Sequence, residues 1–290
     1  MLWIVPIGLL FIGVFLCWQN NGIVVSRIKH QSSKIPEAFN GYRIILVSDL
    51  HNKSFGKDQN RLVKKIQENN PDIIVITGDL IDQRRYNLKP AMDLINKAVA
   101  ITDTFYVSGN HEFWSGKYEE IRSALEKVGV RVLDDLKSQI VREGAVIEIL
   151  GLSDPAFHIS YYEAPERYEE IKSRLNKLTD ERVFQILLSH RPEFFELYVD
   201  QKVDLTLAGH THGGQFRIPK VGGLMAAGQG FFPKYIDRRY EKEDTTMVVS
   251  RGLGNSIIPI RIGNPPELVV VTLKISKEKH EEGSIQGKVS

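Results

Sequence analysis

Five short apolar segments of this chain each end in polar residues that can bind a metal ion. The five endings are Asp49-Leu-His51, Gly78-Asp79, Gly109-Asn110-His111, Ser189-His190 and Gly209-His210-Thr-His212. Imidazole nitrogens and carboxylate or amide oxygens are ligands for divalent transition metals. Taken singly, the Gly-Asp and Gly-Asn endings also fit a turn or a helix cap, and each histidine also fits a packed or surface residue. Their repetition after five separate segments favours one shared metal site.

Each apolar segment predicts a β-strand, because it is short and rich in β-branched and aromatic side chains. The segments cover residues 42–48, 72–77, 104–107, 183–188 and 203–208, and residues 247–250 and 268–273 predict two later strands. Amphipathic helical spacing occurs at residues 59–69, 89–99, 118–128 and 168–178. Strands alternating with helices predict an α/β domain, in which ligands bind beyond the carboxyl ends of the strands. The polar endings fall at that place.

The complete series of endings resembles the motifs of the calcineurin-like metallophosphoesterase family. The matching motifs, in the family's order, are Asp49-x-His51, Gly78-Asp79, Gly109-Asn110-His111-Glu112, His190 and Gly209-His210-Thr211-His212. The resemblance covers residues 42 to about 273 and implies a four-layer α/β/β/α fold with two central mixed sheets. Ser250-Arg-Gly-Leu-Gly254 and Pro266-Glu267 further resemble a bacterial branch of membrane-anchored or exported phosphoesterases.

The resemblance also implies a role for each residue of these motifs. One divalent ion would be bound by Asp49, His51 and His212, a second by Asn110, His190 and His210, and Asp79 would bridge the two. Two such ions clamp a phosphoryl group and lower the pKa of a water that attacks as hydroxide. This ligand set allows Mn, Fe, Zn or Co. His111 would act as the acid toward the leaving oxygen, and Asp82 either orients His111 or caps a helix.

Residues 213–235, which follow His212, combine glycines, cations and apolar side chains. The cations Arg217 and Lys220 are candidate substrate-binding residues, because they suit phosphate. The aromatic residues Phe231 and Phe232 have two interpretations. Exposed, they suit a lipid or an apolar substrate; buried, they pack under the loop like most apolar side chains.

The segment from Leu2 to Trp18 carries no charge and is about the minimum length for crossing a bilayer. It predicts an uncleaved transmembrane helix, because the basic start and small-residue cleavage site of a signal peptide are not seen. An apolar helix packed on the domain is the alternative. The predicted organisation is an anchor over residues 1–20, a linker over 21–40, a phosphoesterase domain over 41–276 and a charged tail over 277–290.

Charge and cysteine content narrow the partners. The 290 residues carry a formal net charge of +2, so nucleic acid is not an expected partner. Cys17, the one cysteine, excludes an intramolecular disulfide. Arg27, Lys29 and Lys34 follow the anchor and favour a cytoplasmic catalytic domain at the cell membrane, with the outer face left open. Nothing in the sequence indicates an oligomeric state.

Together these features predict a metal-dependent phosphoesterase that hydrolyses phosphomonoesters or phosphodiesters. Because the linker is short, the site would stay near the bilayer, where lipid-linked or envelope-precursor substrates are within reach. Two alternatives remain: a membrane-bound scaffold of the same fold without turnover, and a nuclease of the same superfamily.

Overall fold

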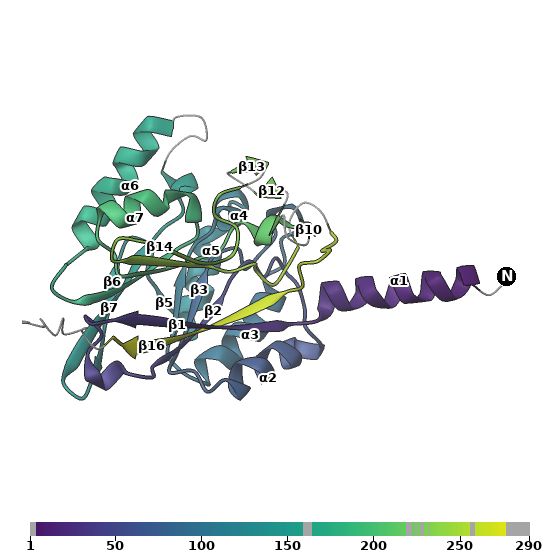
Figure 1. Cartoon of the computed structure of the whole chain (residues 1–290), viewed down its shortest axis with the longest axis horizontal. Helices are drawn as coiled ribbons and strands as arrows, with labels where there is room; N and C mark the ends of the chain where they lie inside the picture. Colours follow the sequence, from purple (N-terminus) through teal and green to yellow (C-terminus); the bar gives the residue numbers. More distant parts are fainter. Residues whose placement is uncertain are drawn as a thin grey trace, which may run out of the picture.

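Two six-stranded mixed sheets form the centre of the molecule (Figure 1). The computed structural model describes residues 4–158, 164–218, 222–223, 225–226, 229–231, 233–255 and 259–276. In order across the first sheet lie β1 (Val24–Ser32), β16 (Glu267–Ile275), β2 (Arg43–Val47), β3 (Ile73–Thr77), β4 (Thr104–Val107) and β5 (Arg131–Val132). In order across the second lie β14 (Arg238–Lys242), β15 (Thr245–Val249), β9 (Leu205–Ala208), β8 (Phe184–Ser189), β7 (Ala145–Leu152) and β6 (Lys137–Arg142).

The strands that carry the polar endings are parallel within each sheet. β2, β3 and β4 pair in parallel in the first sheet, and β8 and β9 do so in the second. Antiparallel pairs occur where β16 meets β2, where β6 meets β7 and where β14 meets β15. All five strands predicted from the apolar segments are present, and so are the two later ones, as β15 and β16. Parallel strands end at the same edge of their sheet, so the polar endings gather there.

Helices cover the outer face of each sheet, which completes four layers. Along β2, Ile44 and Leu46 face the second sheet, whereas Ile45 and Val47 face the helices, as the two-residue period of a strand requires. The helices on the first sheet are α2 (Asn60–Glu68), α3 (Lys89–Val99) and α5 (Tyr118–Lys127). Those on the second are α6 (Ala164–Leu178) and α7 (Phe195–Asp200). The predicted α/β architecture with two mixed sheets is confirmed.

The structure corrects the prediction of a linker over residues 21–40. β1 occupies Val24–Ser32 and pairs with β16 along its whole length, from Val24 against Glu267 to Ser32 against Ile275. β1 is an edge strand, and most of its residues after Val25 are polar, among them Arg27 and Lys29. An edge strand buries only part of its surface, so it lacks the continuous apolar run that marks a central strand.

The first helix, α1 (Ile4–Asn21), extends away from the two sheets (Figure 1). Many of its apolar side chains are exposed, among them Leu10 and Phe11. In the described part of the chain, no helix combines the length and the apolar character needed to cross a membrane, so the predicted transmembrane anchor is not confirmed. The last turn of α1 contacts the domain, since Gln19 Oε1 accepts a hydrogen bond from the Asn264 backbone. The predicted tail over 277–290 lies outside the described residues.

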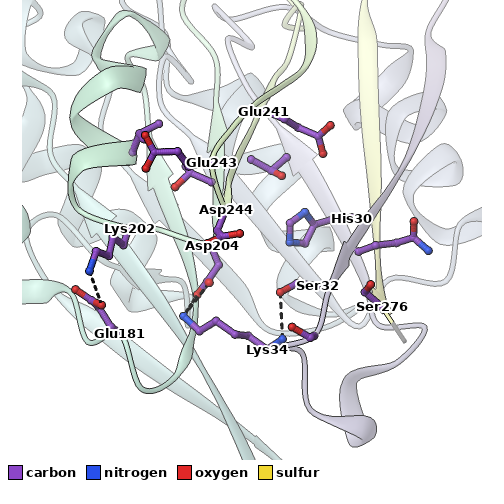
Figure 2. A pocket seen from close by; sticks show the side chains of 15 residues that line it. His30, Ser32, Lys34, Glu181, Lys202, Asp204, Glu241, Glu243, Asp244 and Ser276 are labelled. Atoms are coloured by element: carbon purple, nitrogen blue, oxygen red, sulfur yellow. Dashed lines mark hydrogen bonds and ion pairs between the residues drawn. The ribbon is translucent and has the colours of Figure 1, made fainter. Parts of the chain in front are cut away.

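A cavity of about 750 Å³ lies at the opposite end of the second sheet from the polar endings (Figure 2). Asp204, which precedes β9, and Thr245, the first residue of β15, contribute to its lining. His30 of β1 lies in the same wall, and both of its ring nitrogens are buried without a hydrogen-bond partner among the described residues. This cavity therefore lies at the amino ends of β9 and β15, beside the carboxyl ends of β1 and β16.

Candidate metal centre

The predicted ligands occupy the loops that follow five strands. Asp49 lies beyond β2, Asp79 beyond β3, Asn110 beyond β4, His190 beyond β8 and His210 beyond β9. All seven predicted ligands are buried. The structure therefore brings residues from both sheets to one place.

Five of the seven predicted ligands have a left-handed backbone conformation. Their φ angles are 53° for Asp49, 45° for His51, 53° for Asp79, 71° for His210 and 48° for His212. Non-glycine residues rarely adopt this conformation, and it persists where surrounding structure enforces it, often at functional sites. The backbone packs closely here, since a side chain at Gly209 would overlap the Ser48 hydroxyl and the Asp49 carboxylate.

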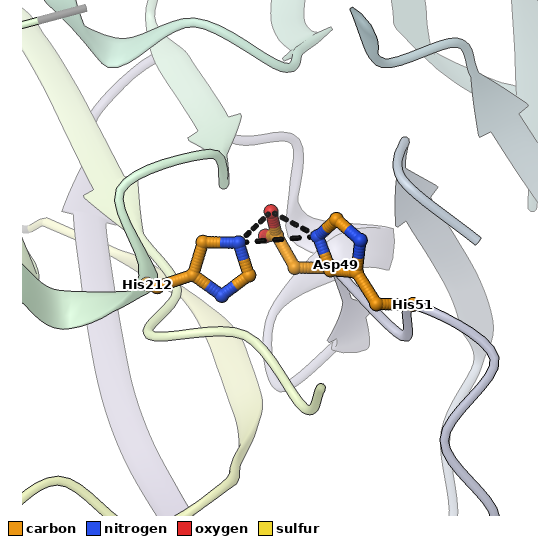
Figure 3. A group of neighbouring side chains, drawn as sticks. All are labelled: Asp49, His51 and His212. Atoms are coloured by element: carbon orange, nitrogen blue, oxygen red, sulfur yellow. Dashed lines mark hydrogen bonds and ion pairs between the residues drawn. The ribbon is translucent and has the colours of Figure 1, made fainter. Parts of the chain in front are cut away.

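Asp49, His51 and His212 form one group of converging side chains (Figure 3). His51 Nε2 lies 3.1 Å from His212 Nε2. Asp49 Oδ1 lies 3.9 Å from His51 Nε2 and 3.4 Å from His212 Nε2. Two ring nitrogens and a carboxylate oxygen at these separations suit a single cation placed among them.

Asp79, His190 and His210 form a second group. His190 Nε2 lies 3.3 Å from Asp79 Oδ2 and 3.0 Å from His210 Nδ1. The other ring nitrogen of His190, Nδ1, donates to the Thr77 carbonyl at 2.7 Å. This hydrogen bond fixes the tautomer and leaves the lone pair on Nε2, directed at the group.

Asn110 and Asp79 complete the arrangement. Asn110, the first residue of α4 (Asn110–Trp114), has a buried side-chain oxygen without a hydrogen-bond partner among the described residues. A buried polar atom left without a partner costs about 1–3 kcal/mol, so this oxygen fits a metal ligand. Asp79 Oδ2 lies 3.4 Å from His51 Nε2 as well as 3.3 Å from His190 Nε2, so its carboxylate borders both groups.

Neighbouring charges keep the carboxylates ionised and shift the pKa values of the histidines in both directions. Burial alone would raise the pKa of Asp49, but His212, His51 and His190 lower it to about 2. Burial lowers the pKa of His212 to about 3, against the opposing influence of Asp49. Against the effect of burial, Asp79 raises the pKa of His190 to about 10, so a bound cation would replace a proton there. Metal binding requires deprotonated carboxylates and neutral imidazoles. The donor set therefore fits divalent cations.

Glu112 holds two of the ligand loops together. Its carboxylate accepts hydrogen bonds at 2.8 Å from the backbone N–H groups of Gly109, Asp79 and Leu80. Burial and the neighbouring Asp79 raise the pKa of Glu112 to about 7. The sequence showed Glu112 inside a motif, but its role is visible only once the loops after β3 and β4 lie side by side.

His111 lies beside both ligand groups. Its ring centroid is 4.5 Å from that of His51, and its backbone N–H donates to Asp79 Oδ1 at 2.9 Å. His111 Nδ1 accepts a hydrogen bond from the Gln83 backbone at 3.2 Å. Asp82 Oδ1 lies 3.8 Å from His111 Nδ1 and accepts a bond from the Arg84 backbone, where it caps a short 3₁₀ turn. The structure thus shows the capping interaction, and the orienting role of Asp82 stays a prediction.

Two arginines that the sequence did not single out contact the predicted ligands. Arg191 Nη1 lies 2.9 Å from His210 Nε2, and its other nitrogens bind Asp154 at 2.6 and 3.1 Å. Arg261 Nη2 lies 3.4 Å from His212 Nδ1, and Arg261 is almost completely buried. The adjacency of Arg191 to His190 was a signal in the sequence; Arg261 offered none, because it lies 49 residues from His212.

The structure describes only some of the candidate substrate-binding residues that follow His212. Arg217 forms an ion pair with Asp237 at 2.9 Å, and Lys220 and Phe232 lie outside the described residues. Phe231 is 76% exposed, whereas Tyr235 is buried. The exposed interpretation therefore holds for Phe231, and both interpretations of Phe232 stay predictions.

Comparison with known proteins identifies the family. Residues 42–214 match the family model described as calcineurin-like phosphoesterase. The uncharacterized metallophosphoesterase YkuE of Bacillus subtilis is 32% identical over 249 residues, which is 84% of this chain and 83% of that protein. The chain belongs to the calcineurin-like phosphoesterase family, as predicted. Membership points to a metal-dependent hydrolase acting on phosphoesters.

Two further proteins match most of the chain. A Danio rerio protein named transmembrane protein with metallophosphoesterase domain is 29% identical over 249 residues, 83% of this chain and 55% of that protein. The solved structure of TT1561 from Thermus thermophilus matches with a TM-score of 0.51 and 15% identity, over 74% of this chain and 91% of that one. At this identity the structural match shows a likeness of fold alone.

Proposed function

We propose that this chain hydrolyses phosphomonoester or phosphodiester bonds with two divalent ions. One ion would be held by Asp49, His51 and His212 and the other by Asn110, His190 and His210, with Asp79 between them. The main support for this proposal is the position of Asp79 Oδ2, which lies 3.4 Å from His51 Nε2 in one group and 3.3 Å from His190 Nε2 in the other. When bound, ions spaced about 3.5–4 Å apart polarise a phosphoryl oxygen and acidify a water molecule. Mn, Fe, Zn and Co all suit the ligands.

His111 is the residue that we propose to act on the leaving oxygen. Because Nδ1 of His111 accepts the Gln83 N–H, the neutral ring carries its proton on Nε2. Burial lowers the pKa of His111, which favours this neutral form. The Nε2–H then donates a hydrogen bond that stabilises negative charge on the leaving oxygen.

A metal titration tests the proposed activity. Purified full-length protein with Mn²⁺ should hydrolyse bis(p-nitrophenyl) phosphate, and a chelator should abolish that hydrolysis until metal is restored. Hydrolysis that a chelator leaves intact would refute the metal-dependent mechanism. A protein that binds two equivalents of metal and hydrolyses neither this diester nor p-nitrophenyl phosphate would instead be the scaffold considered above.

We further propose that the substrate is a lipid-linked phosphoester or an envelope precursor at a membrane surface. Two exposed apolar features support this proposal: Phe11 of α1, 71% exposed, and Phe231, 76% exposed in the segment after His212. Aromatic side chains at the surface suit contact with lipid. Phe231→Ser should lower turnover of a micellar phosphodiester more than turnover of a soluble one. Val141→Ser, at a 65% exposed position on β6, is the matched control.

A further inference from the structure

A cavity of about 410 Å³ adjoins the metal centre on the side of α1. His51 and Asp82 line it next to the metal centre, and Lys53 and Arg85 bring two cations to its wall. The Lys53 ammonium donates to the carbonyl of Asn20, in the last turn of α1. The cavity therefore joins a predicted metal ligand to a patch of positive charge.

These two cations differ from their neighbours because no carboxylate of the described residues lies within ion-pair distance of either. By contrast, the adjacent Arg84 is paired with Asp82 at 3.1 Å, and Arg217 is paired with Asp237 at 2.9 Å. An unpaired guanidinium can bind an oxyanion through two N–H groups, and an unpaired ammonium adds a point charge. Neither charge is thus neutralised by a described carboxylate, and the Lys53 ammonium is held in the wall by the Asn20 carbonyl and the Phe55 ring.

Three amide side chains line the wall, and each makes a hydrogen bond within the protein. Asn52 Nδ2 donates to the Arg85 carbonyl at 2.6 Å, Asn255 Nδ2 donates to the Pro259 carbonyl at 2.7 Å, and Asn87 Oδ1 accepts from the Lys89 backbone at 3.1 Å. The first of these bonds ties the backbone of Arg85 to the residue that follows His51. Asn52 and Asn255 therefore shape the cavity, and Lys53 and Arg85 supply the charge.

We propose that this cavity binds a second anionic group of the substrate, a phosphate or carboxylate carried beyond the reacting phosphate. The inference rests on the proposed hydrolysis at the metal centre and narrows its substrate class. Because His51 belongs to both the ligand group and the cavity wall, a group bound in the cavity lies next to the reacting phosphate. The preferred substrates are phosphoesters with at least two separate negative groups.

A matched pair of symmetric diesters tests this proposal. Bis(4-carboxyphenyl) phosphate carries a carboxylate on each arm, and bis(4-carbamoylphenyl) phosphate carries a neutral amide of nearly the same shape. Since both arms are identical, the result does not depend on which arm enters the cavity. The Mn²⁺-loaded full-length protein should show a kcat/KM about tenfold higher for the carboxylate ester, as expected of charge-assisted hydrogen bonds near a protein surface.

For each variant, the preference is the ratio of kcat/KM for the carboxylate ester to kcat/KM for the amide ester. Arg85→Gln and Lys53→Met should each reduce the preference about threefold, and the double variant should bring it close to one. Lys64→Met, on the exposed face of α2, should keep the wild-type preference. Raising NaCl should weaken the preference in the wild type because salt screens exposed charges.

Three outcomes separate this inference from the proposed function. Hydrolysis of both esters with no preference would overturn the second-anion subsite and leave the metal chemistry intact. A preference that survives in the double variant would likewise overturn the assignment to Lys53 and Arg85. If the metal-loaded wild type hydrolysed neither ester nor bis(p-nitrophenyl) phosphate, the proposed function would fail and the inference with it.

Discussion

The polar side chains at the two ends of the parallel strands differ in whether they already have a partner of opposite charge. Beyond their carboxyl ends, buried carboxylates and histidines converge, with Asp79 within 3.4 Å of His51 and 3.3 Å of His190. At their amino ends, the cavity of about 750 Å³ has lysines that are already paired, Lys34 with Asp204 at 2.8 Å and Lys202 with Glu181 at 3.0 Å (Figure 2). The carboxyl ends thus present oxygen and nitrogen atoms that suit a cation. At the amino ends, the lysines of the cavity are already neutralised by carboxylates.

This contrast shows that cavity size is a poor guide to the reactive end. The cavity beside His51 has about 410 Å³, less than the cavity at the amino ends. The convergence of buried carboxylate oxygens and ring nitrogens marks the carboxyl end instead, as in the group of Asp49, His51 and His212. Such donor groups suit a cation, whatever the volume of the cavity beside them. Four predictions test the contrast between the two ends.

The largest effect is expected from Asp79→Ala. Removing the carboxylate that borders both ligand groups should lower kcat/KM for bis(p-nitrophenyl) phosphate at least about 10³-fold, because two-metal hydrolysis needs both ions held together. Elemental analysis of the purified variant should show less than the wild-type metal content. Asp204→Ala, at the opposite end, is the control and should keep both metal and activity. Full activity in Asp79→Ala would refute the assignment of the site.

His111→Ala should reduce kcat by about a hundredfold, the size usual for a positioned proton donor. Its metal content should stay at the wild-type level, because His111 donates to the leaving oxygen in our proposal and is not a ligand. The comparison of kcat with metal content distinguishes this role from ligation. A parallel loss of metal and activity would instead make His111 a ligand, as its grouping with His51 and Asp79 also allows.

Glu112→Gln tests the hydrogen bonds that join the loops after β3 and β4. An amide in place of the carboxylate has only one acceptor oxygen for the N–H groups of Gly109, Asp79 and Leu80, so metal affinity should fall about 10–100-fold. Competition with a metal-binding dye measures that affinity. Glu119→Gln, on the exposed surface of α5, should leave affinity unchanged. Equal affinity in the two variants would show that Glu112 does not support the ligands.

Features that depend on neighbouring residues in the sequence could be predicted, whereas features that depend on distant residues could not. The central strands follow from local pattern, and so does the placement of the seven predicted ligands just beyond them, whereas the role of each predicted ligand comes from the family resemblance. Glu112, Arg191 and Arg261 act through contacts with residues that are distant in sequence or on another loop, which spacing does not reveal. The sequence predicts a linker where β1 lies, because this edge strand lacks a continuous apolar run. The paired state of Arg217 likewise depends on Asp237, twenty residues further along the chain.

The smallest effect on activity is expected from His30→Leu, at the opposite end from the metal centre. Burial, aided by Arg239, lowers the pKa of His30 from its ordinary value of 6.5 to about 4. Between pH 6.5 and 4 the unfolded chain therefore binds a proton at His30 that the folded chain does not, so wild-type stability falls as the pH drops through this window. His30→Leu has no ring to protonate, so it lacks this pH-dependent loss of stability. Its free energy of unfolding relative to wild type should rise by up to about 3 kcal/mol from pH 7 to pH 4, as urea denaturation would measure.

At pH 7 the variant should unfold with a free energy equal to that of the wild type or up to about 1 kcal/mol higher, since leucine removes two buried ring nitrogens that have no hydrogen-bond partner among the described residues. Hydrolysis of bis(p-nitrophenyl) phosphate should stay within about twofold of wild type. Lys34, Asp204 and Glu241 line the same cavity in both proteins, so their titration cancels in the difference. A large loss of activity without a loss of stability would mean that the two ends are coupled. Because each lysine at the amino end already has its carboxylate and His30 is held neutral by burial, we expect that end to contribute stability alone.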